Sequence, residues 1–336
     1  MSQFTSAIAS TQRPGPAVAV QRLLHRHPAL SPAVILVIIV IAFTIVNPRF
    51  SNPQTLSLLL QQTAVIAALA VGQTLIILTA GIDLSVGAAA ILASLVMAEV
   101  SAGMGMPGWL ALIVGGIVGI AAGALNGILV TRLSLPPFIV TLATLSVFTA
   151  IALLISGAQS TSAKDMPDLL SWTGMTFGLG GFSITTGVLL VLAMYAVVAF
   201  ALNRTAWGTH VYAVGGDAEA ARLSGIRVSR VTMSVYLVAG LTYAVAAWVL
   251  IGRAGAATPN GIVDGNLQSI TAVVIGGTSL FGGRGGIGGT LLGALIVQSL
   301  TVGLSLAGVD AQFRLLAVGA LVLFAVALDQ WIRKAR

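Results

Sequence analysis

The sequence predicts an all-α polytopic membrane protein of about ten transmembrane helices, with both termini in the cytoplasm and interrupted helices in each half. Hydrophobic residues make up 57% of the 336 residues and charged residues only 7%, unlike the composition of an ordinary globular domain. Apolar runs follow one another along the chain, and each crossing needs about 20 such residues. The chain therefore has room for about ten crossings and for no sizeable soluble domain.

Ten apolar runs give the predicted helices. The first run follows a basic tail, residues 1–31, and no small-residue cleavage site comes after it, so we expect an uncleaved helix. The transmembrane domain is expected to span residues 32–331, with a short cytoplasmic tail at 332–336. The predicted helices cover residues 32–47, 55–80, 84–101, 108–131, 137–157, 185–202, 231–252, 268–281, 287–307 and 312–331.

The distribution of Lys and Arg predicts the orientation. With the N-terminus in the cytoplasm, twelve of the sixteen basic residues fall in inner segments, and only four fall outside: Arg49, Lys164, Arg253 and Arg314. Lys and Arg accumulate in the cytoplasmic loops of membrane proteins. This bias agrees with ten alternating spans and accounts for the net charge of +7 without a nucleic-acid partner.

A glycine-rich stretch, GGRGGIGG at residues 282–289, contains the pattern Gly-x-Gly-x-x-Gly through Gly283, Gly285 and Gly288. A phosphate-binding loop of this kind follows a strand and opens an amphipathic helix. Here the stretch separates two apolar runs, which predicts a tight turn between closely packed helices. The chain also lacks a Walker-type loop, so we expect no ATPase site of its own.

We predict no catalytic residues, metal site or cofactor in this chain. Cys is absent and the three His residues lack the spacing of zinc ligands. No serine-hydrolase or zinc-protease motif occurs, and no span holds paired carboxylates. A transport function remains.

Glycines recur every four residues along the fourth predicted helix, at Gly115, Gly119, Gly123 and Gly127. This spacing places them on one face, where the missing side chains let another backbone approach closely. We interpret them as helix-packing residues.

Two predicted spans are interrupted or short. Asp83 lies between Gly81 and Gly87 at the start of the third helix, and the run at 268–281 has only fourteen residues. Such segments in the two halves of a transporter point to its central pathway, because freed backbone groups must line a cavity or be buried in protein.

Five polar positions within or beside the apolar spans are candidates for the translocation pathway. A charge near the bilayer centre costs about 2.5–3.5 kcal/mol on insertion scales, so Asp83 needs an interface or neighbouring partners. It could cap the third helix together with Ser85, or it could contact substrate; both roles stay open. The candidates are Gln73, Asp83, Ser85, Asn126 and Gln298.

The inner loop at residues 203–230 predicts a two-turn helix. Asp217 suits the N-cap, Glu219 places negative charge in the first turn, Ala220 and Ala221 favour helix, and Gly225 suits the C-terminal stop. So short a helix is marginal in water unless it packs on something. We interpret it as a docking element, with an ordinary solvated loop as the alternative.

Several motifs together carry a family resemblance. Glu219-Ala220-Ala221 followed by Gly225 is similar to the Glu-Ala-Ala-x-x-x-Gly core of the loop by which permeases of ABC importers engage their ATPases, although the later Leu-Pro is missing. GIDLSVG, LPPFIVTLAT and GGTSLFGGRGGIGGTLLGALIV resemble the ribose/xylose/arabinose-type ABC permeases. These motifs span residues 72–298, nearly the whole chain.

The resemblance implies a function and a set of partners. Two copies of the permease, or this chain and a paralogue, would form the pathway in a bacterial inner membrane. A tandem ATPase carrying ATP and Mg²⁺ would dock on the inner loop, and a periplasmic or extracellular binding protein would deliver a monosaccharide or small polyol. A branched-chain amino-acid permease and an ion-coupled secondary transporter using Asp83 are the alternatives. The sequence leaves the particular sugar open.

The outer loop at residues 158–185 is the candidate surface for the binding protein. It carries Lys164, Asp165, Asp168 and Trp172, which are charged and aromatic groups suited to a protein contact.

Overall fold

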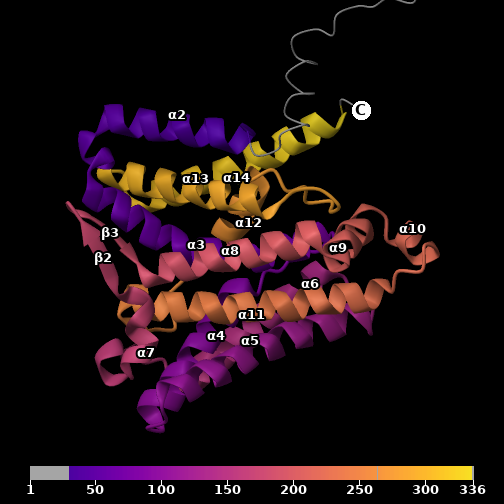
Figure 1. The fold of residues 1–336 in the computed structure, drawn as a ribbon, viewed down its shortest axis with the longest axis horizontal. Helices are drawn as coiled ribbons and strands as arrows, with labels where there is room; N and C mark the ends of the chain where they lie inside the picture. The colour runs from indigo at the N-terminus through magenta and orange to yellow at the C-terminus, as the bar shows by residue number, and fades with distance from the viewer. Residues whose placement is uncertain (1–29, 263, 335–336) are drawn as a thin grey trace, which may run out of the picture.

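The computed structural model describes residues 30–262 and 264–334, and it confirms an all-α polytopic architecture (Figure 1). Seven helical segments in these residues are long and apolar enough to cross a membrane. They are α3 (Pro53–Leu78), α4 (Val86–Ala98) with the π-helix η2 (Glu99–Gly103), α5 (Gly108–Thr131), α6 (Pro137–Ser156), α8 (Thr186–Arg204), α11 (Val228–Ala254) and α13 (Ile287–Leu306).

Three further helices, with shorter apolar stretches, lie where the other three spans were predicted: α2 (Leu30–Val46), α12 (Gly265–Ile275) and α14 (Ala311–Lys334). Helix α14 continues three residues past the predicted 331. The expected tail at residues 1–29 and the last two residues, 335–336, lie outside the described part of the chain.

In the second half, the bounds of one predicted span are wrong and one helix was not predicted. The span expected at 268–281 is α12, which starts at Gly265 and ends at Ile275 because Gly277 follows in a left-handed conformation, with φ of 86°. The inner loop contains a second helix, α9 (Ala206–Gly216), ahead of the predicted one. Thr205 caps it by accepting a hydrogen bond from the backbone of Gly208.

Helices α3 and α11 form the middle of the bundle. Helix α11 packs on α5, α3 and α4, while α3 also contacts α13, α12 and α8. Figure 1 shows α2, α13 and α14 on one side of this pair and α4 and α5 on the other. Both central helices are buried along most of their length, so polar groups on them lie inside the protein.

The glycines of α5 lie where another helix comes closest. A Cβ on Gly119 or Gly123 would overlap the backbone oxygens of Gly240 and Tyr236 in α11, whereas Gly115 faces the Met97 side chain of α4. Gly127 also faces α11, with the Met233 sulfur 2.6 Å from where its Cβ would be. The absent side chains allow α5 and α11 to meet backbone to backbone.

One glycine assigned to packing differs from this expectation. A Cβ on Gly288 would meet no atom within 4 Å among the described residues, since Gly288 points away from the neighbouring helix. Gly283 and Gly285, with φ of 70° and 128°, adopt conformations that suit glycine in a tight turn.

Segments between the helices close the end of the bundle predicted to face outwards. Strand β2 (Thr176–Leu179) pairs with β3 (Phe182–Thr185), and β1 (Thr161–Ser162) pairs with β4 (Ala256–Ala257). Between them lie α7 (Asp168–Ser171) and the short helices η3 (Ala163–Asp165) and η4 (Trp172–Gly174). The segment at 158–185 is therefore a folded cap, which we call the outer cap.

The close approach of α5 and α11 predicts different effects for two similar substitutions. Gly123→Ala places a methyl against the Tyr236 backbone and should destabilise the protein by about 1–3 kcal/mol. Gly116→Ala, on the same helix but with no atom within 4 Å of the new Cβ, should be neutral or stabilise by up to about 1 kcal/mol. Thermal unfolding in detergent measures both, and equal midpoints would contradict the packing account.

Candidate functional site

The first interrupted segment, residues 79–85, holds a buried chain of hydrogen bonds. Asp83 Oδ1 accepts from the backbone N–H of Ser85 at 2.7 Å and from its hydroxyl at 2.6 Å, and Oδ2 accepts from the Tyr243 hydroxyl at 3.0 Å. Asn126 Nδ2 donates to Ser85 Oγ, and Thr144 Oγ1 donates to Asn126 Oδ1. The chain links the α3–α4 segment to α5, α6 and α11.

Asp83 itself is almost completely enclosed, with 1% of its surface exposed. Three donors point at its carboxyl group, so both of its oxygens have hydrogen-bond partners. Asp83 also orders the start of α4 by binding the N–H of Ser85, the residue that precedes the helix. The bond lies one residue ahead of α4, whose N-cap residue Ser85 makes no side-chain bond to the helix.

The second interrupted segment meets the first one. Helix α12 is only about 16 Å long, too short for a hydrocarbon core of about 30 Å. At its start, Asn266 Oδ1 accepts from the backbone N–H of Gly87 in α4 at 2.7 Å. The two broken segments, one in each half of the chain, are therefore joined directly at the start of both helices.

The remaining pathway candidates lie near this meeting point but outside the Asp83 chain. Gln298 of α13 donates to Gln268 of α12 at 2.9 Å. Gln73 of α3 is fully buried, and neither atom of its amide group has a hydrogen-bond partner among the described residues. Asp83, Ser85 and Asn126 thus form one group, and Gln298 belongs to another.

The sequence analysis missed Asn266 and Gln268. Both are amide residues at the start of a short apolar run, and amides in such a position were available as a signal. Asn266 was left in the preceding loop because the predicted helix began at residue 268, and Gln268, the first residue of that helix, was not considered.

At the opposite end from the outer cap, the predicted docking helix is present as α10 (Ala218–Leu223). Asp217 Oδ1 accepts from the backbone N–H groups of Glu219 and Ala220, both at 3.0 Å, which is an N-cap. Gly225, with φ of 86°, ends the helix in a left-handed conformation. The sequence alone therefore specifies this helix.

The predicted docking residues do not all face outwards. Asp217, Glu219, Ala220 and Gly225 are exposed, but Ala221 is buried and anchors α10 to the bundle. Glu219 accepts two hydrogen bonds from Arg222, which raise the pKa of the Arg222 guanidinium.

Leu223 is a further outward-facing residue of α10. Its side chain is 76% exposed. The sequence analysis did not single it out, although a leucine within a polar loop was a usable signal.

Three backbone segments meet next to α10: Leu78–Ala80, Gly215–Gly216 and Gly282–Gly283. We call this contact the inner junction. Gly283 N–H donates to Leu78 O at 3.0 Å. A Cβ on Gly215 would overlap that same oxygen. The Tyr212 hydroxyl, whose pKa is raised by burial, donates to Gly285 O at 3.0 Å. The glycine-rich turn is thus held against α3 and α9 by backbone contacts.

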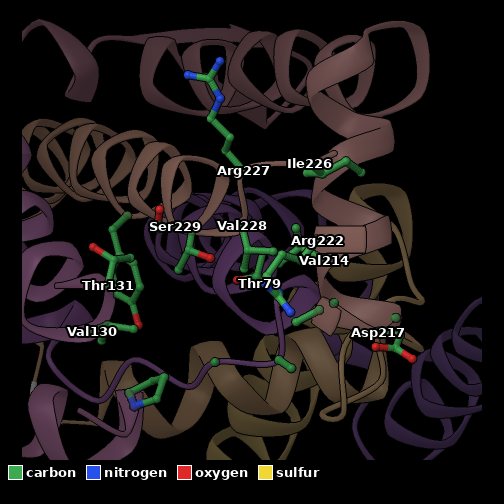
Figure 2. Close-up of a pocket in the computed structure, with 18 of the residues that line it drawn as sticks. Thr79, Val130, Thr131, Val214, Asp217, Arg222, Ile226, Arg227, Val228 and Ser229 are labelled. Atoms are coloured by element: carbon green, nitrogen blue, oxygen red, sulfur yellow. The ribbon is translucent and has the colours of Figure 1, made fainter. Parts of the chain in front are cut away.

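Beside the inner junction lies a cavity of about 810 Å³. Figure 2 shows Val130 and Thr131 of α5 on one side, Asp217 on the other, and Arg227 pointing away from the middle. The cavity separates α10 and the start of α11 from the segment that carries Asp83.

The predicted surface residues of the outer cap are exposed. Lys164, Asp165, Asp168 and Trp172 all reach solvent, and the Trp172 ring stacks on Trp248 of α11 with centroids 5.6 Å apart. The cap is tied to the bundle, so a force on it would reach α11.

Comparison with known proteins assigns the family. The family described as branched-chain amino acid transport system / permease component matches residues 55–326. The chain belongs to this family. The match covers both interrupted segments, the outer cap, α10 and the glycine-rich turn, so the whole candidate site lies within the permease family domain.

Relatives of this permease match along most of their length. The fructose import permease protein of Rhizobium meliloti is 46% identical over 318 residues, covering 94% of this chain and 88% of that one. The ribose import permease protein of Bacillus subtilis is 39% identical, covering 90% and 92%. The xylose transport system permease protein of Escherichia coli is 32% identical, covering 83% and 86%.

Three buried tyrosines allow the Asp83 chain to be tested with one chemical change. Tyr243 donates to a carboxylate, Tyr195 donates to the backbone oxygen of Ala67, and Tyr236 Oη has no partner among the described residues. Tyr→Phe should cost about 1.5–3 kcal/mol at 243, about 0.5–1.5 kcal/mol at 195, and about zero at 236. Thermal unfolding in detergent ranks the three variants by stability. A larger loss of stability at position 236 than at 243 or 195 would contradict the prediction.

Proposed function

We propose that this chain is the membrane-spanning permease subunit of an ATP-driven, binding-protein-dependent importer of a monosaccharide or a related small polyol. The identity to sugar import permeases over nearly the whole chain carries the proposal. The family description names branched-chain amino acids, but the three relatives are named for fructose, ribose and xylose. This favours the sugar over the amino acid.

We infer one partner for each end of the molecule, because α10 and the outer cap are both exposed. A tandem ATPase, which binds ATP and Mg²⁺, docks on α10 through Glu219, Ala220 and Leu223. A periplasmic or extracellular binding protein docks on the outer cap, and a second copy or a paralogue completes the pathway. The location is a bacterial inner membrane. Exposure of α10 and of the cap residues supports these contacts.

The inner junction supplies a mechanical link for import. Gly216 directly precedes Asp217, the cap of α10, while Leu78 precedes the Asp83 segment and Gly283 follows α12. Close-packed backbones transmit displacement because they have no slack. A push on α10 is therefore passed to both interrupted segments at once, which suits a change of access from the outer to the inner side.

The docking role predicts loss of the ATPase in the α10 variants but not in a matched control. Glu219→Ala removes the partner of Arg222, and Leu223→Asp removes the exposed apolar contact. Each should reduce the ATPase that co-purifies with the tagged chain by about tenfold or more, as expected for a hot spot. Glu99→Ala, at an exposed position towards the opposite end, should leave it unchanged. Wild-type chain without an ATPase would contradict the function.

The mechanical link predicts uncoupling at a second matched pair. Gly215→Ala forces α9 away from Leu78 O, while Gly216→Ala meets no atom within 4 Å. Gly215→Ala should keep its bound ATPase and lose most ATP-driven uptake; Gly216→Ala should retain both. The measurement is uptake together with ATP hydrolysis in proteoliposomes. Normal coupling in Gly215→Ala would contradict the link.

A further inference from the structure

The start of α12 carries amide groups whose hydrogen-bonding capacity is only half used. Asn266 uses Oδ1 to accept from Gly87, and Gln268 uses Oε1 to accept from Gln298. Nδ2 of Asn266, Nε2 of Gln268 and Oε1 of Gln298 have no partner among the residues that the structure describes. Two donors and one acceptor are therefore available to a ligand.

These amides lie at membrane depth. A Cβ on Gly265 would lie 3.3 Å from Leu69 Cδ1, and Leu69 is about 24 Å along α3, whose length is about 39 Å. Gln298 is about 16 Å along α13, whose length is about 30 Å. The positions of Leu69 along α3 and of Gln298 along α13 both place the start of α12 near the middle of the bundle rather than at either end.

The side chains of Asn266 and Gln268 are also partly exposed on the surface of the single chain. Unpaired polar groups facing hydrocarbon cost several kcal/mol each. Polar residues at this depth accordingly face a water-filled cavity or another part of the protein. The exposed side of the α12 start is therefore not a lipid-facing surface.

Gln73 of α3 is a further amide residue on a helix that contacts the start of α12. It is four residues after Leu69 in α3 and so shares the face that meets Gly265. Its amide is fully buried and unpartnered among the described residues, a costly state unless another conformation of the protein satisfies it. It is a fourth amide with unused hydrogen-bonding groups, on the helix that contacts the α12 start.

We propose that the start of α12 is a sugar-contact site of the translocation pathway. Asn266 Nδ2 and Gln268 Nε2 donate to hydroxyl oxygens of the passing sugar, and Gln298 Oε1 accepts from a hydroxyl. Amides without a cation suit an uncharged polyol, and the neighbouring Asp264 carboxylate disfavours anionic sugar phosphates. This site rests on the proposed import function.

Two substitutions remove the donors and keep the bonds that hold the helices together. Asn266→Asp retains the oxygen that accepts from Gly87, and Gln268→Glu retains the oxygen that accepts from Gln298. Gln312→Glu makes the same change at an exposed position at the start of α14. The assay is uptake of labelled fructose and ribose by proteoliposomes that contain the permease, its ATPase and its binding protein.

The two donor variants should reduce uptake of the transported sugar at least about tenfold, with stimulation of the ATPase by the loaded binding protein retained and Gln312→Glu like wild type. Joint loss of uptake, ATPase stimulation and thermal stability would show a merely structural role and overturn the site. Wild-type uptake in both donor variants would also overturn it. Failure of the wild type to take up either sugar with ATP would instead overturn the proposed function, and this site with it.

A second measurement does not depend on the variants being active. Because the chain has no cysteine, Gln268→Cys introduces a single thiol. A charged, membrane-impermeant methanethiosulfonate reagent should label it, and the transported sugar should slow that labelling. A thiol that the reagent never reaches, or labelling that the sugar does not slow, would overturn the site.

Discussion

Polar groups at membrane depth must find partners inside the protein, and the rest of this structure depends on how two broken segments meet that requirement. Asp83 takes the freed N–H of Ser85, and Asn266 takes the freed N–H of Gly87. Because Asn266 belongs to α12 and Gly87 to α4, the second bond also joins the two halves. The close backbone contact of α5 with α11 holds the helices that surround the first segment. The broken segments are thereby fixed relative to each other by direct hydrogen bonds.

This arrangement connects the ends of the molecule. The exposed helix α10 reaches the broken segments through the inner junction, where backbone meets backbone, while the outer cap reaches α11 through the Trp172–Trp248 stack. A cavity lies on one side of α10, whereas the backbones at the inner junction are in close contact. The inner junction therefore joins α10 to the two segments that are weakest as membrane spans.

Local features of the fold were predictable from the sequence, and long-range partnerships were not. Apolar runs located ten apolar helices, seven of them long enough to cross a membrane, and Asp217 with Gly225 located α10, because periodicity and capping are local. Helix α9 was missed because Gly208, Gly215 and Gly216 lower helix propensity, although packing stabilises it. The proximity of Ser85 to Asp83 was visible, whereas the bond from Tyr243, 160 residues away, depends on tertiary structure. Asn266 was missed because the predicted helix began at residue 268, after it.

The most direct test of the account is ATP-dependent uptake by purified components. The chain would be reconstituted into liposomes with its ATPase and its binding protein, with Mg-ATP on the inner side, and sugar accumulation followed with and without a protonophore. The account predicts uptake that requires ATP hydrolysis and is unaffected when the proton gradient is collapsed. Uptake that persists without the ATPase and stops with the protonophore would contradict it, and Asp83 would then be the candidate coupling residue.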